Sequence, residues 1–444
     1  MKTIIAFLAV LMSVLLCGCS FDSSVENLLT APRLTPEQSE IYGELQKTVG
    51  SNIKLKYPKS GDYRSAFVLH NIDDDGDDEA MVFYESTNVQ SGESALRLKI
   101  LDKTDGKWEA VYDLACSGSE VDSISFAKLG SSEGIKIIAC YTLLTQSEKA
   151  FDLLSYENRA LTKVYSSAYS CLEVFDMNGD GMDELITVTA DKANHLSSAA
   201  MFTDGGNGFA KLSDVTFGGD ATEYLKVTKG RLSESIPAIF LDYSRGSGQS
   251  GTEVLYCFGD RLYSPESASD AGNMISRLTN DYMPEIYSFD IDNDGYVEIP
   301  STTPLPGYEM LTKPEQLCAV QWYTVSDGNY IQEYYSYYSG KYGFVLLFPN
   351  RWRGVVSAVA DFNTNEIVFI SYNSKIGLEV SEKTELMRIR TVDKDDEQAM
   401  KNAAGMKILG ETEDILYCCS ETGGYLTGKL ALTESELRNC FIIM

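Results

Sequence analysis

The sequence predicts a mainly β protein with a small α+β region at its C-terminal side. Short apolar segments, partly β-branched, alternate with turn signals from about Tyr63 to Tyr338, as all-β sandwiches and propellers require. Within that stretch an acidic nine-residue loop recurs three times, each time between two apolar segments. Helical patterns flank the stretch, before Gly50 and after Gly340. We therefore expect a series of small sheets from 63 to 339, with the acidic loops joining strand to strand.

The three acidic loops share one pattern that is suited to a hard cation. Oxygen-bearing side chains occupy positions 1, 3, 5 and 9, and glycine occupies position 6, where it permits a sharp turn. A backbone carbonyl at position 7 adds a ligand, and the ninth residue, always Glu, closes the cage. The predicted calcium ligands are Asn71, Asp73, Asp75, Asp77 and Glu79 in loop 1; Asp176, Asn178, Asp180, Met182 and Glu184 in loop 2; and Asp290, Asp292, Asp294, Tyr296 and Glu298 in loop 3.

Two other interpretations of these loops fit less well. An EF-hand needs a bidentate Glu at position 12, where this chain has Val82, Thr187 and Ser301. Solvated acidic turns are the second alternative, since Asp, Asn and Gly favour turns in any case. Turn preference alone does not place Glu at the ninth position three times. Loop 1 begins with Asn71 instead of Asp, which removes one formal charge from its ligand set.

The loops and their flanks resemble FG-GAP or VCBS calcium-binding repeats. The resemblance rests on the D-x-[DN]-x-D-G-x-x-[DE] pattern and on the apolar strands around it, such as Ala80 to Tyr84 and Leu185 to Thr189. In that family such loops connect neighbouring strands of an integrin-like β-propeller blade. The resemblance implies a β-propeller and a structural role for up to three calcium ions.

The spacing of the loops predicts the number of blades. The loops begin at 71, 176 and 290, so their starts lie 105 and 114 residues apart. Each separation is about twice the ~40–50 residues of a four-stranded blade. Blades without an acidic loop are therefore expected over 121–166 and 221–264, which gives about five to six blades. A stack of β-modules that never closes into a ring is the structural alternative.

The first residues predict a lipoprotein signal. Lys2 precedes an apolar run from Ile4 to Leu16, which is too short for a typical spanning helix. The run ends in Leu16-Cys17-Gly18-Cys19, which resembles a bacterial lipobox. We expect a signal peptide over 1–18, diacylglyceryl and palmitate chains on Cys19 as the membrane anchor, and a flexible tether over 19–33. An ordinary secretory signal is the alternative.

Two further segments flank the predicted propeller. Over 34–62 we expect a helix with its lead-in, because Thr35 is a suitable N-cap, Pro36 suits the first helical position and Gln38 completes a capping box. Over 340–444 we expect a separate α+β domain. Its Phe348-Pro349-Asn350-Arg351-Trp352 run resembles the opening of PsbP-like or Mog1-like accessory domains.

Composition and motifs disfavour several classes of function. The net charge of −28 argues against a nucleic-acid partner, since phosphates would be repelled. His70 and His195 are the two histidines, and neither lies in an H-E-x-x-H motif. Eight cysteines follow Cys19, with no C-x-x-C pair to indicate zinc. We therefore expect that the chain is not an enzyme.

The leading hypothesis is a lipid-anchored, extracytoplasmic protein of the bacterial cell envelope or cell surface. Its calcium-stabilised propeller would act as a binding module for an unidentified protein or glycan ligand. One alternative is a carbohydrate-active hydrolase or lyase, because a catalytic carboxylate pair could lie among the many acids. Another alternative is an envelope assembly scaffold.

Overall fold

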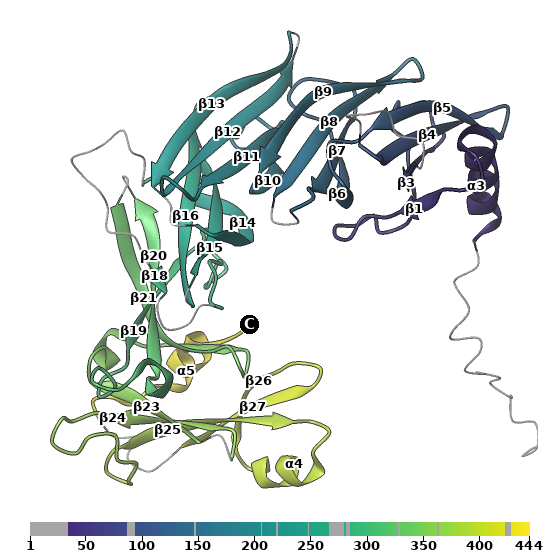
Figure 1. Cartoon of the computed structure of the whole chain (residues 1–444). Coiled ribbons are helices and arrows are strands. Elements are labelled where there is room, and N and C mark those ends of the chain that lie inside the picture. The colour runs from purple at the N-terminus through teal and green to yellow at the C-terminus, as the bar shows by residue number, and fades with distance from the viewer. Residues whose placement is uncertain are drawn as a thin grey trace, which may run out of the picture.

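The fold is known from a computed structural model that describes most of the chain from residue 34 onward. It describes residues 34–86, 94–145, 148–205, 207–218, 221–246, 248–265, 279–280, 285–326, 329–361, 364–421 and 428–444. Over these residues the chain forms six antiparallel sheets and three α-helices, which confirms a mainly β protein (Figure 1). The predicted signal peptide, Cys19 and the tether lie outside the described residues.

The first sheet follows the predicted N-terminal helix, α3. The helix begins after Thr35, whose hydroxyl accepts the Gln38 N–H in the predicted capping box. Ile41 and Leu45 are buried on one face of α3 and pack in a cluster with Trp108 of the sheet. The elements are α3 Pro36–Val49, β1 Lys54–Lys56, β2 Phe67–His70, β3 Glu79–Glu85, β4 Leu96–Thr104 and β5 Lys107–Ala115. β1 and β2 both pair with β3 and so lie along the same edge of it.

The next three sheets repeat a simple up-and-down arrangement of four consecutive strands. The second sheet contains β6 Glu120–Ala127, β7 Lys136–Thr142, β8 Lys149–Glu157 and β9 Ala160–Tyr169. The third contains β10 Cys171–Phe175, β11 Glu184–Asp191, β12 Leu196–Gly205 and β13 Gly208–Gly218. The fourth contains β14 Glu223–Ser233, β15 Ile236–Gly246, β16 Gln249–Phe258 and β17 Arg261–Tyr263, and β18 Thr279–Asn280 pairs with β16.

The fifth and sixth sheets share a core at the C-terminal side of the chain. The fifth contains β19 Ile299–Pro304, β20 Cys318–Ser326, β21 Asn329–Ser339, β22 Phe344–Leu347 and β28 Phe441–Ile443. The sixth contains β23 Val356–Asp361, β24 Glu366–Ser371, β25 Glu385–Asp393, β26 Lys407–Glu411 and β27 Ile415–Glu421. Two helices, α4 Glu397–Ala403 and α5 Glu434–Cys440, and two 3₁₀ turns, η1 Lys313–Glu315 and η2 Asn350–Trp352, complete the described elements.

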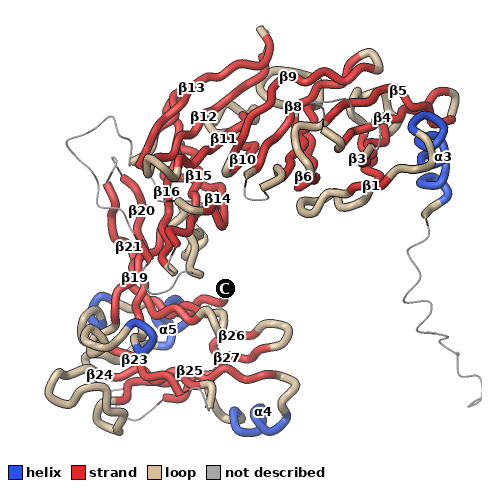
Figure 2. Tube along the Cα trace, in the orientation of Figure 1, coloured by secondary structure: helices blue, strands red, loops and turns tan. Residues whose placement is uncertain are grey.

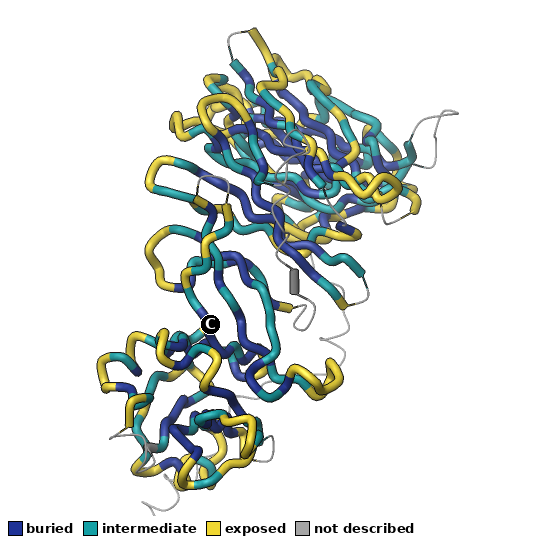
Figure 3. The backbone as a smooth tube through the Cα atoms, turned by 90° about the vertical axis from the view of Figure 1, so that its left-hand side faces the viewer, coloured by how far each residue is buried: buried dark blue, intermediate teal, exposed yellow. Residues whose placement is uncertain are grey.

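Neighbouring sheets pack face to face, which explains the nearly continuous apolar middle strands. In β7, Ile137 lies in a cluster with the first sheet, whereas Ile138 lies in a cluster with the third. Successive residues of a strand point to opposite faces of the sheet. A sheet that is covered on both faces therefore needs apolar residues at both odd and even positions of its strands. Figure 3 shows buried residues along the strands and exposed residues at the turns.

The sheets follow one another along a curved row (Figures 1 and 2). The first sheet lies at one end of this row. The fifth and sixth sheets lie at the other end. A closed ring would place the first sheet beside the fifth. The arrangement is therefore that of a row of modules, which is the alternative that the sequence analysis left open.

The boundary predicted at residue 340 falls inside the fifth sheet. β22 pairs with β21, and the C-terminal β28 adds to the edge of β22. The Phe348-to-Trp352 run leads out of this sheet: the rings of Phe348 and Trp352 meet at 5.3 Å, and the buried Trp352 donates its indole N–H to the Leu430 carbonyl. This run therefore seals the core shared by the fifth and sixth sheets.

Candidate functional site

The acidic loops lie at matching places in alternate sheets. Loop 1 (71–79) joins β2 to β3, loop 2 (176–184) joins β10 to β11, and loop 3 (290–298) leads into β19. They thus mark the first, third and fifth sheets. The second and fourth sheets, which have no such loop, span 120–169 and 223–263, close to the ranges expected for unmarked modules.

The ninth residue of each loop has a structural role that the sequence analysis did not foresee. Each Glu is buried, and one of its oxygens accepts the backbone N–H of position 2, which is also buried. This bond ties the start of the loop to the first residues of the following strand. The pairs are Ile72 with Glu79 at 2.8 Å, Met177 with Glu184 at 3.0 Å, and Ile291 with Glu298 at 2.9 Å.

Loop 1 gathers three carboxylates around one point. One oxygen each of Asp73, Asp75 and Glu79 lies within 4.8 Å of the other two. The Oε1 oxygen of Glu79, which is not the one that accepts the Ile72 N–H, is buried without a hydrogen-bond partner. The residue as a whole is 0% exposed. A buried carboxylate oxygen without a partner is costly unless a cation or a donor neutralises it. This all-oxygen donor set fits a calcium ion.

A fourth carboxylate near loop 1 comes from a neighbouring strand. Asp102 of β4 is 5% exposed and accepts the Tyr156 hydroxyl at 3.2 Å. Burial raises the pKa of Glu79 to about 7, and the nearby charges of Asp73 and Asp102 add to that rise. The loop pattern carried no signal for Asp102, because it lies outside the nine residues.

Loop 3 also forms a carboxylate cluster, with a different membership. Its three members, Asp290, Asp292 and Asp294, lie within 4.8 Å of one another. Glu298, the predicted closing ligand, is not a member of this group, although the charges of all three aspartates act on it. Tyr334 of β21 donates its hydroxyl to Asp292 at 2.6 Å, which joins the loop to the sheet.

Loop 2 is held mainly by its own hydrogen bonds. Both oxygens of Asp176 accept backbone N–H groups of the loop, among them Gly181 at 3.0 Å. The amide of Asn178 donates to Asp180 at 3.1 Å and to Asp260 of the β16–β17 turn at 3.2 Å. Among the described residues, the acids of loop 2 do not form a three-carboxylate group of the kind found in loops 1 and 3.

The ionisation of the loop glutamates reflects their burial. Burial raises the pKa of Glu184 to about 7 and that of Glu298 to about 8, and neighbouring loop aspartates add to both rises. Position 7 behaves alike in all three loops: the N–H groups of Asp77, Met182 and Tyr296 donate to the carboxylate at position 5. Crowded carboxylates with raised pKa values are the electrostatic signature of a site that a cation would relieve.

The two histidines lie in different settings, one packed among aromatic rings and one in a turn. The ring of His70 stacks on Phe126 at 3.9 Å, and the Tyr63 hydroxyl lies 3.2 Å from His70 Nδ1. Burial lowers the pKa of His70, which favours its neutral form. His195 lies in the turn between β11 and β12.

A cleft of about 630 Å³ opens between the fourth and fifth sheets, beside loop 3. We call it the 4–5 cleft. Aromatic, hydroxyl and acidic side chains line it together. The lining residues are Leu232, Ser233, Ile236, Tyr256, Phe258, Asp294, Tyr296, Glu298, Thr324, Val325, Ser326, Glu333 and Tyr334.

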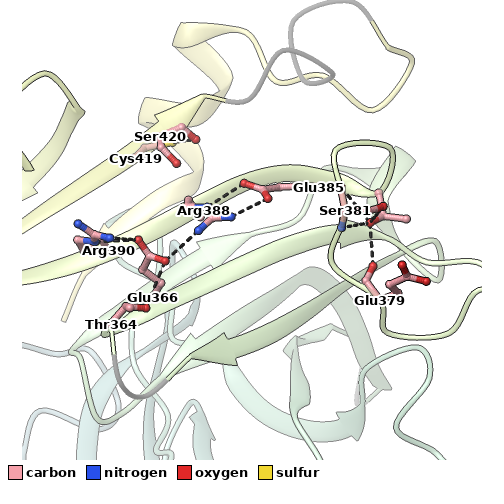
Figure 4. Close-up of polar contacts among 10 residues, drawn as sticks. Thr364, Glu366, Glu379, Ser381, Glu385, Arg388, Arg390, Cys419 and Ser420 are labelled. Carbon is pink, nitrogen blue, oxygen red and sulfur yellow. Dashed lines mark hydrogen bonds and ion pairs between the residues drawn. The ribbon is translucent and has the colours of Figure 1, made fainter.

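A second polar cluster lies on the sixth sheet, and Figure 4 shows its contacts. Arg388 makes a bidentate pair with Glu385 at 2.7 and 2.8 Å and also reaches Glu366 at 3.0 Å. Arg390 pairs with the other oxygen of Glu366. The two carboxylates are buried and the two guanidiniums partly buried. Because these charges are paired across adjacent strands, the cluster serves as a strand-pairing ladder.

Comparison with known proteins gives matches among solved structures only. No protein-family model and no curated protein matches the chain. One matched structure is a family 43 β-1,3-galactosidase with galactodeoxynojirimycin, at 9% identity and a TM-score of 0.25, covering 63% of this chain and 96% of that one. Another is the rhamnogalacturonan lyase YesW, at 11% identity and a TM-score of 0.30; the match covers 72% of this chain and 74% of that one.

A third matched structure is an α-L-arabinofuranosidase from Fusarium graminearum, at 11% identity and a TM-score of 0.25, covering 71% of this chain and 90% of that one. These matches contradict the prediction that the chain is not an enzyme, since a galactosidase, a lyase and an arabinofuranosidase stand among the matched structures; at these identities and TM-scores they assign no activity to this chain. The sequence analysis inferred this absence partly from the lack of an H-E-x-x-H motif, which a carboxylate mechanism does not need.

Proposed function

We propose that this chain is a calcium-stabilised protein directed at carbohydrate. In this proposal the first five sheets are blade-like modules of an open row, and the acidic loops of alternate modules hold structural cations. The observation that carries the calcium part is the buried, unpartnered Oε1 of Glu79 beside Asp73 and Asp75. Solvated turns do not explain it, because a solvated carboxylate would have water within reach.

Calcium would be held by the chain's own oxygens in two of the loops. Asp73, Asp75 and Glu79 would hold one ion, and the aspartates of loop 3 would hold another. Bound calcium neutralises the crowded carboxylates and stabilises only the folded loop, so it raises stability by mass action. Loop 2, in which an amide occupies the third position, would bind calcium most weakly.

Calcium content tests this part directly. Native mass spectrometry of protein dialysed against calcium should show two to three ions per chain, and chelator should remove them. Magnesium at equal concentration serves as the control, because it prefers a rigid octahedral site with several waters. A chain that carries no calcium at millimolar concentration would contradict the proposal.

Carbohydrate is the proposed ligand class because aromatic rings and acids lie together in the 4–5 cleft. Cleavage is a second candidate function, since two carboxylates beside a glycosidic bond are sufficient for hydrolysis. Glu333 is the lining acid that lies outside the three loops. A polysaccharide screen with detection of released sugars tests cleavage, and Glu333→Gln should abolish any turnover while leaving calcium content unchanged.

Lipid anchoring in the bacterial envelope is a separate part of the proposal. It rests on the Leu16-to-Cys19 sequence, outside the described residues. None of the helices that the structure describes is long and apolar enough to cross a bilayer. Labelling with palmitate in cells should mark the chain and should be lost in Cys19→Ser, with Cys17→Ser as the matched control. Equal labelling of both variants would reject Cys19 as the site.

A further inference from the structure

We propose that the 4–5 cleft binds a neutral oligosaccharide, with Phe258 and Tyr296 as stacking surfaces for sugar rings. This inference rests on the proposed carbohydrate function and gives it a place and a ligand charge. Its support comes from the rings in the cleft, from the charge of the lining and from the way the cleft is held rigid.

The aromatic side chains offer apolar faces at an accessible position. Phe258 ends β16 and is 72% exposed, although it borders the cleft. Tyr256 stacks on Tyr263 at 5.7 Å, and the guanidinium of Arg261 lies 5.3 Å from the Tyr263 ring centre. Such bracing fixes Tyr256 in the cleft wall. The C–H face of a sugar ring packs well against an aromatic face, and removing that face from water contributes to binding.

The charge of the cleft selects against anionic ligands. Glu333 is the lining acid outside loop 3, and no Lys, Arg or His is present among the described residues that line the cleft. Ser233, Thr324 and Ser326 add hydroxyl groups. Carboxylates accept hydrogen bonds from sugar hydroxyls, whereas the carboxylate of a uronic acid or a sulfate group would be repelled. The net charge of −28 on the whole chain also repels anionic ligands.

The two walls of the cleft belong to one packed unit. Ala238, Phe240 and Val254 of the fourth sheet share an apolar cluster with Val297 of loop 3 and Ile299 of β19. Gly230 of β14 lies so close that an added Cβ would be 2.4 Å from the Val297 side chain. A cleft that is already formed loses little conformational freedom when ligand binds.

Loop 3 connects cation binding to the same cleft. Tyr334 lines the cleft and donates its hydroxyl to Asp292, one of the three clustered aspartates. Asp294 belongs both to that cluster and to the lining. A calcium ion in loop 3 would therefore fix one wall, and removal of calcium should weaken sugar binding.

The test measures binding of defined oligosaccharides to the calcium-loaded full chain. Tetrasaccharides of galactan, arabinan and β-glucan serve as neutral probes, and tetragalacturonate serves as the anionic probe, all by isothermal titration calorimetry. Phe258→Ala and Tyr296→Ala should each weaken the best neutral ligand by roughly tenfold or more. Tyr57→Ala is the matched control: Tyr57 is also an exposed ring, at 61%, but directly follows β1 of the first sheet and does not line the cleft.

Each outcome decides the inference. A neutral ligand that is lost in the two cleft variants and kept in Tyr57→Ala supports it. A neutral ligand bound equally by all three variants places the site elsewhere, so the inference fails while the proposed function stands. Binding of the anionic probe alone overturns the inference. If no probe binds to calcium-loaded, cooperatively melting protein, the carbohydrate function fails as well, although the calcium sites remain.

Discussion

At the scale of single residues, buried carboxylates control the behaviour of this chain. Glu79 and Asp242 are both at most 2% exposed, but they are neutralised in different ways. Glu79 has one oxygen without a partner. Asp242 accepts hydrogen bonds from the Thr252 hydroxyl and from both the backbone and side chain of Ser288. The first arrangement calls for a cation, and the second is satisfied by donors.

Glu79→Gln should affect stability with opposite signs in the presence and absence of calcium. In calcium the variant loses a ligand and should bind one ion fewer and melt at a lower temperature. In chelator it should melt at the same or a higher temperature than the wild type, because the amide removes a charge that burial disfavours. Differential scanning calorimetry checks both, with the exposed Glu397→Gln as control. A loss of stability of equal size in both buffers would contradict the account.

Asp242 should make stability fall as pH rises from about 4 to about 6. Burial raises its pKa from 3.8 to about 6 in the folded chain, so the folded state keeps a proton that the unfolded state has released. The effect amounts to about 3 kcal/mol over that window. Asp242→Asn has no titrating group there. The difference between the wild-type and variant unfolding free energies should be constant below pH 4, change by about 3 kcal/mol between pH 4 and pH 6, and be constant again above pH 6, as denaturant titrations would show.

At the scale of the elements, the three loops differ more in structure than in sequence. Their shared pattern predicts three similar sites, with one formal charge fewer at the first position of loop 1, where Asn71 replaces Asp. The structure instead gathers three carboxylates in loop 1 and three in loop 3. In loop 2 the side-chain amide of Asn178 donates a hydrogen bond to Asp180. The bond from position 2 to the ninth Glu is common to all three loops. Sequence alone predicts the place of each loop, but which oxygens converge depends on contacts from outside it, such as Asp260 and Tyr334.

Asn178→Asp should convert loop 2 into a stronger calcium site. The change adds a carboxylate at position 3 to those of Asp176, Asp180 and Glu184, and it removes the amide donor that bonds to Asp180. Calcium titration should show a several-fold tighter affinity at one site, because each added ligand charge strengthens binding of a hard cation. Asn194→Asp, in an exposed turn of the same sheet, is the matched control. An unchanged affinity would mean that the number of carboxylates in loop 2 does not limit its binding of calcium.

At the scale of the whole molecule, the six sheets form a row in which neighbouring sheets share apolar cores. Few segments of the chain can therefore be separated from the rest as domains. The helix at Pro36–Val49 and the alternation of sheets with and without an acidic loop follow from capping residues and loop spacing, so both can be predicted. The boundary at 340 cannot be predicted in this way, because β28 joins the fifth sheet from the far end of the chain. Tyr335 and Tyr337 of β21 are buried in the core shared by the last two sheets.

A chain that ends at residue 340 should therefore lose the fifth sheet. The cut removes β22 and takes Phe344 and Trp352 away from the core that buries Tyr337. Limited proteolysis should show new cleavage within 285–340, and the truncated chain should aggregate through its exposed β21 edge. A chain that begins at residue 34 and ends at 444 serves as the control and should melt like the full chain. A truncated chain that resists protease throughout 285–340 would restore the predicted boundary.

The central claim is that calcium held in the acidic loops stabilises the row of sheets. The most direct measurement is the melting temperature of the full chain at pH 7.5, in millimolar calcium and in excess chelator. Two occupied sites at about 100 times their Kd would add roughly 5 kcal/mol, so calcium should raise the melting temperature by several degrees, reversibly. The same melting temperature in both buffers, with no ion bound by native mass spectrometry, would contradict the claim.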